Sequence, residues 1–159
     1  MKYATSFSDL LMSDEITEIS GMEFMQGILN GTLPHPPIGP TMNYHLHSVE
    51  DGKVAFRGTP KFDHCNPMRT VHGGWYGTLL DSCMACAVMT KVPKGSAYTT
   101  LEYKINITRA IPVDMEIEAV GTIDHVGRKT GVAHGEIRGV ADGKLYATGS
   151  TTCIVMKIG

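Results

Sequence analysis

A lone carboxylate lies in the stretch from residue 63 to 92, where charge is otherwise scarce. Between His72 and Lys91 the only charged side chain is Asp81. The run is apolar on nearly every face, which predicts a long buried helix that ends before Pro93. A carboxyl group inside such a helix is costly without a partner or a purpose. Asp81 is therefore a candidate general base or nucleophile.

Two consecutive glycines begin this predicted helix. Gly73 and Gly74 place no side chain over their N–H groups, and the first N–H groups of a helix have no partner within it. These donors and the helix dipole favour a developing negative charge. The pair therefore predicts an oxyanion site, and close approach of a strand to the helix is the structural alternative.

The spacing of these groups predicts how a site would be assembled. Gly73 and Asp81 are eight residues apart, or about 12 Å along one helix at roughly 1.5 Å per residue. Both cannot reach one carbonyl, because hydrogen-bond reach is about 3 Å. If both act, Asp81 of one subunit faces Gly73 of another, which predicts a homodimer with two equivalent sites. Alternatively, Asp81 accepts a hydrogen bond from Thr78 or Ser82 and has no catalytic part.

Redox and metal chemistry are disfavoured by the same stretch. Cys83 and Cys86 have the spacing of a redox motif, but the middle of a helix does not stabilise a thiolate. His64, Cys65 and His72 lack the second close pair of ligands that zinc sites have. We therefore expect free thiols and no metal.

The composition limits the class of protein. The chain has 159 residues, about the size of one domain, and a formal net charge of −2. This charge gives no indication of nucleic acid or of a membrane surface as a partner. The first residues lack the apolar run of a signal peptide, and no segment approaches the roughly 20 apolar residues of a membrane span. We therefore expect a cytoplasmic protein.

The elements around the long helix follow from local patterns. Ser20 and Glu23 form a capping box ahead of a short amphipathic helix, and an Asn-Gly pair ends it. Residues 1–19 are weakly patterned and predict a loose arm. The proline-rich segment 33–40 predicts an extended connector.

Strand-like runs make up most of the remaining chain. They cover residues 42–49, 53–58, 98–109, 115–123, 130–140 and 145–156. Hairpin signals join two pairs of these runs, so the sheet should be antiparallel. A sheet with one apolar face needs a cover, and the long helix needs to be enclosed. The sequence therefore predicts an α+β domain over 42–159, preceded by the arm and short helix of 1–41.

The spaced motif Asn66-x5-His72-Gly73-Gly74-x6-Asp81 resembles the signature of hotdog-fold acyl-CoA thioesterases of the phenylacetic-acid-degradation (PaaI-like) type. The segment 99–110 resembles that family's strand after the central helix, and the resemblance covers most of the chain beyond the arm. It implies the hotdog fold, a curved antiparallel sheet wrapped around a long central helix. It also implies acyl-CoA hydrolysis, with coenzyme A as part of the substrate and no separate cofactor.

The resemblance implies a role for each matching residue. The Gly73 N–H and the Asn66 side chain would polarise the thioester carbonyl, with His72 shaping the same loop. Asp81 would activate water or act as a nucleophile, and Thr100 would help to place that water. The resemblance also agrees with a homodimer, or a tetramer built from two dimers.

Coenzyme A would lie, by the same resemblance, along residues 107–112 and 126–131. Arg109, Arg128 and Lys129 are candidates for its phosphates, and the alternative is that they are ordinary solvated cations. The other substrate-binding candidates are Gly74, Thr99 and Thr130.

Two other functions stay open. A hotdog-fold hydratase or dehydratase would use a His paired with an acid, but helix geometry puts His72 off the surface that carries Asp81. A non-catalytic acyl-CoA binding module would keep the pocket without turnover. Pro67 and Arg69 depart from the smaller, less charged loop of the family, which leaves the substrate preference open.

Overall fold

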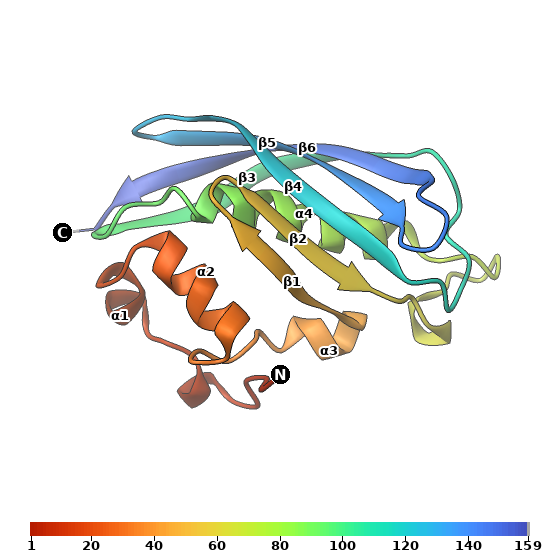
Figure 1. The fold of residues 1–159 in the computed structure, drawn as a ribbon, viewed down its shortest axis with the longest axis horizontal. Helices are drawn as coiled ribbons and strands as arrows, with labels where there is room; N and C mark the ends of the chain where they lie inside the picture. The colour runs from red at the N-terminus through yellow and green to blue at the C-terminus, as the bar shows by residue number, and fades with distance from the viewer. Residues whose placement is uncertain (159) are drawn as a thin grey trace.

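A six-stranded antiparallel sheet curves over one long helix in the computed structural model, which describes residues 1–158 (Figure 1). The helix is α4 (Gly73–Met89). The strands are β1 (Tyr44–Glu50), β2 (Lys53–Gly58), β3 (Ser96–Ile107), β4 (Ile117–Val126), β5 (Thr130–Gly139) and β6 (Leu145–Lys157). Their order across the sheet is β1-β2-β4-β5-β6-β3. The predicted α+β class, with a curved sheet around a central helix, is confirmed.

The centre of the core is α4, because its side chains are apolar on almost every face. Leu79, Leu80, Cys83 and Met84 are fully buried. The sheet approaches the helix most closely at Gly121 of β4, where an added Cβ would lie 2.2 Å from the Cys83 carbonyl oxygen. Only a glycine permits this approach. The sheet therefore holds α4 by direct backbone packing.

The strand β3 is an edge of the sheet and lies along α4. An added Cβ at Gly73 would contact Ile107 Cδ1 at 3.6 Å, and one at Gly77 would contact the Tyr103 hydroxyl at 3.2 Å. Apolar residues take every second position of this strand from Leu101 to Ile107. Leu101 is nevertheless 59% exposed, and Tyr103 and Ile107 are each 47% exposed. Within residues 1–158 no second strand pairs with this edge, so these side chains remain open to solvent.

The N-terminal arm is ordered, so the expectation of a loose arm is wrong. It contains a 3-10 turn, η1 (Phe7–Asp9), and a short helix, α1 (Ser13–Thr17), and the predicted amphipathic helix follows it as α2 (Gly21–Asn30). Ala4 N–H donates to His35 O of the proline-rich connector at 2.9 Å, and Gly95 N–H of the domain donates to Thr17 O at 2.8 Å. The predicted capping box and glycine stop of α2 are confirmed.

The proline-rich connector is not extended throughout, which corrects a second expectation. Residues Ile38–Met42 form a short helix, α3, with Pro37 as its N-cap and Pro40 in its first turn. Proline is tolerated there because the first N–H groups of a helix have no intrahelical partner. The strand β1 therefore begins at Tyr44 and not at residue 42.

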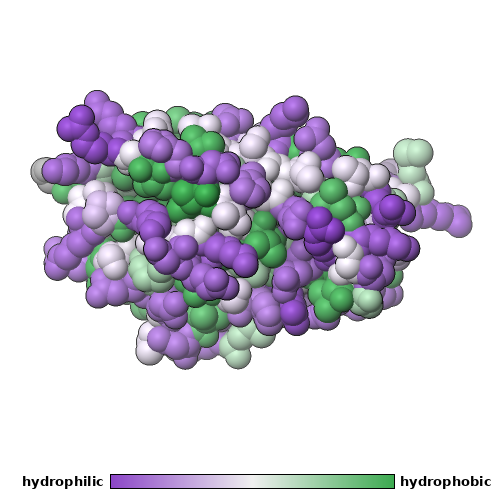
Figure 2. All heavy atoms as spheres, turned by 45° about the horizontal axis from the view of Figure 1, so that its top comes forward, coloured by the Kyte–Doolittle hydropathy of each residue, from purple (hydrophilic) through white to green (hydrophobic). Residues whose placement is uncertain are grey.

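The surface in Figure 2 is mostly hydrophilic, with hydrophobic side chains in small separate patches. Within residues 1–158, no helix combines the length and apolar character needed to cross a membrane.

Candidate active site

The carboxylate of Asp81 on α4 has one hydrogen-bond partner, which lies on the strand β3. The Thr100 hydroxyl donates to Asp81 Oδ1 at 3.0 Å. Burial raises the pKa of Asp81, and the hydrogen bond from Thr100 lowers it in part. The side chain is half-buried. A half-buried carboxylate with a raised pKa is a better proton acceptor near neutral pH than an exposed one.

Thr78 and Ser82, the residues predicted as alternative hydrogen-bond partners of Asp81, both form hydrogen bonds with other groups. The Thr78 hydroxyl donates to Gly74 O at 2.9 Å. Ser82 Oγ is hydrogen-bonded to the Tyr44 hydroxyl at 2.9 Å. The alternative in which Asp81 is satisfied within its own helix is therefore wrong.

The start of α4 offers one free backbone donor, not two. His72 is the N-cap, and its Nδ1 accepts a hydrogen bond from Gly74 N–H at 2.8 Å. The expectation that both glycines expose their N–H groups is therefore wrong for Gly74. Gly73 is the first helical residue, and its N–H has no acceptor within residues 1–158. His72 thus orients the helix start and leaves Gly73 as the donor.

The loop ahead of α4 is held by the side chain of Asn66. Its Oδ1 accepts from Met68 N–H at 2.9 Å, and its Nδ2 donates to Thr70 Oγ1 at 2.8 Å. An asparagine amide carries two donor hydrogens, so one remains for a further acceptor. Arg69, at the tip of this loop, adopts a positive φ of 64° and is exposed. The Asn66 side chain therefore holds the loop through hydrogen bonds to Met68 and Thr70.

The cysteines and His64 are the side chains that redox or metal chemistry would use here. All four cysteines are free, and burial raises the pKa of the Cys86 thiol to about 12. The Nδ1 of His64 accepts from Lys61 N–H at 2.8 Å, and its Nε2 lies 3.0 Å from Thr41 O. Both ring nitrogens therefore have structural partners. Across residues 1–158, no three His, Cys, Asp or Glu side chains gather as metal ligands.

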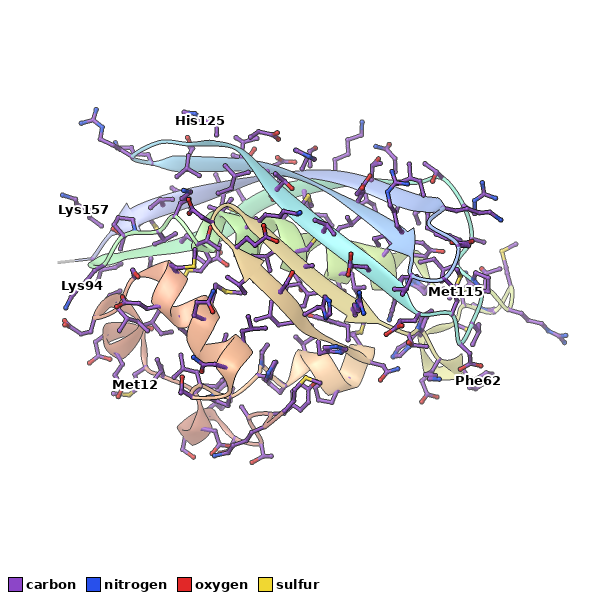
Figure 3. The ribbon with its side chains drawn as sticks, viewed as in Figure 1. Met12, Phe62, Lys94, Met115, His125 and Lys157 are labelled. Carbon is purple, nitrogen blue, oxygen red and sulfur yellow. The ribbon has the colours of Figure 1, made fainter. Side chains whose placement is uncertain are left out.

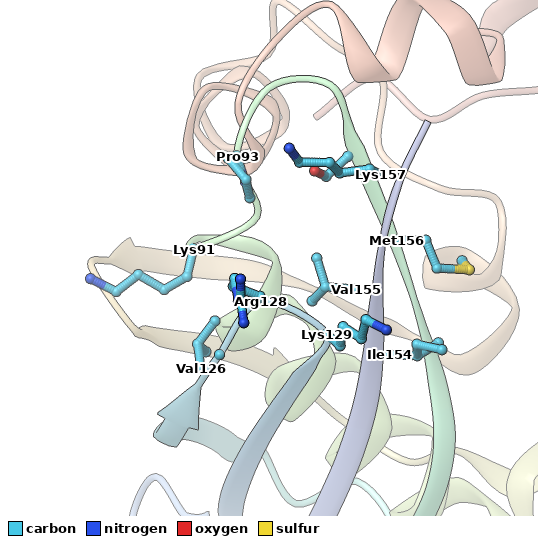
Figure 4. Close-up of a pocket in the computed structure, with 11 residues that line it drawn as sticks. Lys91, Pro93, Val126, Arg128, Lys129, Ile154, Val155, Met156 and Lys157 are labelled. Atoms are coloured by element: carbon cyan, nitrogen blue, oxygen red, sulfur yellow. The ribbon is translucent and has the colours of Figure 1, made fainter. Parts of the chain in front are cut away.

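A basic pocket of about 720 Å3 opens where the β4–β5 turn meets the end of β6 (Figure 4). Its cations are Lys91, Arg128, Lys129 and Lys157. Only Arg128 and Lys129 were predicted from sequence. The two lysines were missed because they come from the end of α4 and the C-terminal strand. Only the folded chain brings these four cations together.

Arg109 lies far from this pocket. Its N–H donates to Tyr146 O at 3.1 Å, whereas Lys129 O accepts from Val155 N–H at 2.8 Å. Nine residues of β6 separate those two contacts, which is about 30 Å at roughly 3.3 Å per residue. Figure 3 shows the same separation, with Lys157 at one end of the molecule and Met115, in the loop after Arg109, at the other.

The two remaining candidates, Thr99 and Thr130, make no hydrogen bond to Asp81. Thr99 is exposed and precedes Thr100 on β3, and adjacent residues of a strand face opposite sides. Thr130 begins β5, next to the basic pocket, and is also exposed.

A long buried helix wrapped by an antiparallel sheet, with a half-buried carboxylate on the helix and a free N–H at its start, defines a hotdog-fold protein. The family model described as the thioesterase superfamily matches residues 68–146. The resemblance to hotdog-fold thioesterases of the PaaI-like type noted in the sequence is confirmed. No curated protein sequence matches the chain.

Solved structures with the same fold include three relevant examples. A putative thioesterase from Ralstonia eutropha, related to phenylacetic acid degradation, is 25% identical, with a TM-score of 0.75 over 82% of this chain and 98% of that one. A conserved Pseudomonas aeruginosa protein is 28% identical, with a TM-score of 0.70 over 76% and 94%. A hypothetical thioesterase from Streptococcus pneumoniae, solved with coenzyme A, is 26% identical, with a TM-score of 0.65 over 73% and 88%.

Proposed function

We propose that this protein hydrolyses acyl-CoA thioesters, with Asp81 as the base that activates water and the Gly73 N–H as the oxyanion donor. The observation that carries the proposal is the half-buried Asp81 carboxylate on α4, which accepts a hydrogen bond from Thr100 on β3. Thiolates leave readily, so a polarised carbonyl and an activated water suffice without a strong general acid. The Asn66 amide keeps one donor hydrogen that can join Gly73 at the carbonyl oxygen.

The arrangement of α4 supports a homodimer as the active form. Gly73, Gly77 and Asp81 follow one another at intervals of four residues and so lie on one side of the helix. Gly77 is the midpoint, so a two-fold axis passing near it brings Gly73 of one subunit to Asp81 of the other. The exposed Tyr103 and Ile107 on β3 line the same side and would be covered by the partner subunit. Assembly of two such dimers into a tetramer stays a prediction, as does the cytoplasmic location.

The basic pocket is our proposed site for the phosphates of coenzyme A. Three of its cations, Arg128, Lys129 and Lys157, have no ion-pair partner within residues 1–158. Unpaired cations gathered at one pocket favour a multiply charged anion. The Streptococcus pneumoniae relative was solved with coenzyme A, which supports this choice of ligand.

Replacing Arg128 with alanine is expected to raise KM for an acyl-CoA about tenfold and to change kcat little, because only the remote phosphates lose a partner. Steady-state thiol release at low and high salt measures this. The KM of an acyl-pantetheine thioester, which lacks the nucleotide, should be unaffected. Lys144→Ala, at the distant β5–β6 turn, is the control. Equal losses with both substrates would contradict a phosphate role.

Thr100→Val is expected to shift the acid limb of the kcat profile to higher pH. The active form has Asp81 ionised, so the rate falls as pH drops through the raised pKa of Asp81. The Thr100 hydrogen bond favours the carboxylate, and its loss raises that pKa further. Rate measurements from acid to neutral pH test this, with Thr122→Val on β4 as the control. An unchanged acid limb would show that Thr100 does not affect the pKa of the catalytic base.

A panel of acyl-CoA thioesters assayed for free-thiol release tests the function itself. It contains acetyl, butanoyl, octanoyl, decanoyl, dodecanoyl and phenylacetyl thioesters, with an enoyl-CoA added to detect hydration. Thiol release from at least one member, dependent on Asp81, supports the proposal. Binding without release would identify a non-catalytic acyl-CoA binding module, and water addition to the enoyl group would identify a hydratase.

A further inference from the structure

We infer that the N-terminal helices α1 and α2 close an apolar pocket that holds a medium-length acyl chain, and so set the substrate preference. The inference rests on the proposed thioesterase function. The pocket has a volume of about 260 Å3 and lies between these helices, the end of α4 and the start of β3. It is lined by Ser13, Ile16, Phe24, Met89, Ser96, Ala97 and Tyr98.

The pocket lies on the same rows of α4 and β3 as Asp81 and Thr100. On α4, Asp81, Ala85 and Met89 follow at intervals of four residues and form one row along the helix. On β3, Tyr98 and Thr100 are two residues apart and so share a face. Thr100 contacts Asp81 at one end of this pair of rows, and Tyr98 and Met89 line the pocket at the other.

The chemistry of the lining fits a hydrocarbon. None of the lining side chains is charged. Phe24, Met89 and Tyr98 supply large apolar surfaces, and burial of each methylene group favours binding about fourfold. The intermediate position on the α4 row is Ala85, which carries only a methyl group. In the inferred position, an acyl chain follows this row from Asp81 to the pocket and passes the buried Ala85.

The distance between the two ends sets a length. Asp81 and Met89 are eight residues apart on α4, or about 12 Å along the helix axis. An extended chain with bonds of about 1.5 Å advances roughly 1.3 Å per carbon, so about nine carbons reach from the carbonyl to the pocket. A straight acyl chain near decanoyl in length thus matches the site.

The helices that close the pocket are fixed to the protein at this point. Gly95 N–H donates to Thr17 O at 2.8 Å, and Gly21 N–H donates to Val92 O at 2.9 Å. These bonds tie the end of α1 and the start of α2 to the connection between α4 and β3. Gly21 also packs directly on Met89, since an added Cβ would lie 1.8 Å from the Met89 carbonyl oxygen. Helices α1 and α2 therefore form a fixed wall of the pocket.

Two substitutions that change the pocket in opposite directions test the inference. Ile16→Trp fills the space and is expected to lower kcat/KM for decanoyl-CoA at least tenfold relative to butanoyl-CoA. Phe24→Ala enlarges the pocket. It is expected to raise kcat/KM for dodecanoyl-CoA several-fold relative to kcat/KM for decanoyl-CoA. Phe7→Ala is the matched control, because Phe7 belongs to the same arm but is 94% exposed and lies outside the pocket. Circular-dichroism melting checks that each variant folds.

The results separate this inference from the proposed function. If the wild-type protein hydrolyses acyl-CoA thioesters but neither variant changes the chain-length profile, the inference is overturned and the function stands. A wild-type preference for phenylacetyl-CoA over decanoyl-CoA would also overturn it. If the wild-type protein hydrolyses no acyl-CoA in the panel, the binding of decanoate to the pocket is measured by calorimetry. Binding that Ile16→Trp abolishes supports the pocket, and no binding to the wild-type protein refutes it.

Discussion

Asp81→Asn is expected to lower kcat for acyl-CoA hydrolysis about 1,000-fold while KM stays within about twofold. Asparagine has nearly the same shape and can still contact Thr100, but it cannot take a proton from water. The change therefore removes a group needed in the transition state and leaves ground-state binding intact. Steady-state thiol release with the best substrate of the panel measures both constants.

The matched control for this variant is Asp124→Asn, an exposed aspartate on β4 whose Oδ1 lies 2.7 Å from His134 Nδ1. Its kcat should equal that of the wild-type protein. Retention of more than about a tenth of the rate by Asp81→Asn would exclude Asp81 as the base.

Stability provides an independent check that Asp81→Asn folds. Burial raises the pKa of Asp81, so the folded state binds this proton more tightly than the unfolded chain does. The free energy of unfolding therefore falls as pH rises from the ordinary carboxyl pKa through the raised one. Asparagine avoids this loss. The variant should melt at or above the wild-type temperature at neutral pH, and the difference should close at acid pH.

Gly73→Pro is expected to lower kcat about 100- to 1,000-fold, because it deletes the N–H that would stabilise the oxyanion. The local backbone suits a proline. Position 73 is the first residue of α4, where proline is favoured, and the N–H lost has no partner within residues 1–158. The preceding residue, His72, already has the extended conformation that a following proline requires, with φ −63° and ψ 139°.

Gly73→Ala separates the loss of the donor from the addition of a side chain. Alanine keeps the N–H, and its Cβ would meet Ile107 Cδ1 at 3.6 Å, an ordinary contact distance. Its kcat should stay within a few-fold of the wild-type value. If alanine and proline cause equal losses, the effect is steric and the donor role is wrong.

Mixing the Gly73→Pro and Asp81→Asn chains tests whether each active site is shared between two subunits. In a shared-site dimer, each mixed pair holds one site with both defects and one with neither. Equal mixing after unfolding and refolding should therefore restore about a quarter of the wild-type activity. Activity that stays at the level of the separate variants would show that both groups serve a site within one subunit.

Local patterns in the sequence were sufficient for most of the architecture. The apolar run predicted α4, and the turn signals and alternation predicted six strands with boundaries close to those observed. The capping box predicted α2. These predictions succeed because helix periodicity, strand alternation and cap chemistry involve residues that are close along the chain. The arm and α3 were missed because their order depends on contacts with distant segments, such as the pairing of Ala4 with His35.

Some features of the candidate site could likewise be predicted from local sequence, and others depend on tertiary packing. The sequence by itself determined that Gly73 and Asp81 share one helix about 12 Å apart, because helical rise is a local constant. Only the tertiary structure decided that Asp81 bonds to Thr100 and that His72 occupies the Gly74 N–H. It also decided that the basic pocket excludes Arg109 and that the arm encloses an apolar pocket. Sequence spacing carries no information about such pairings, because each depends on how separate strands and helices pack against one another.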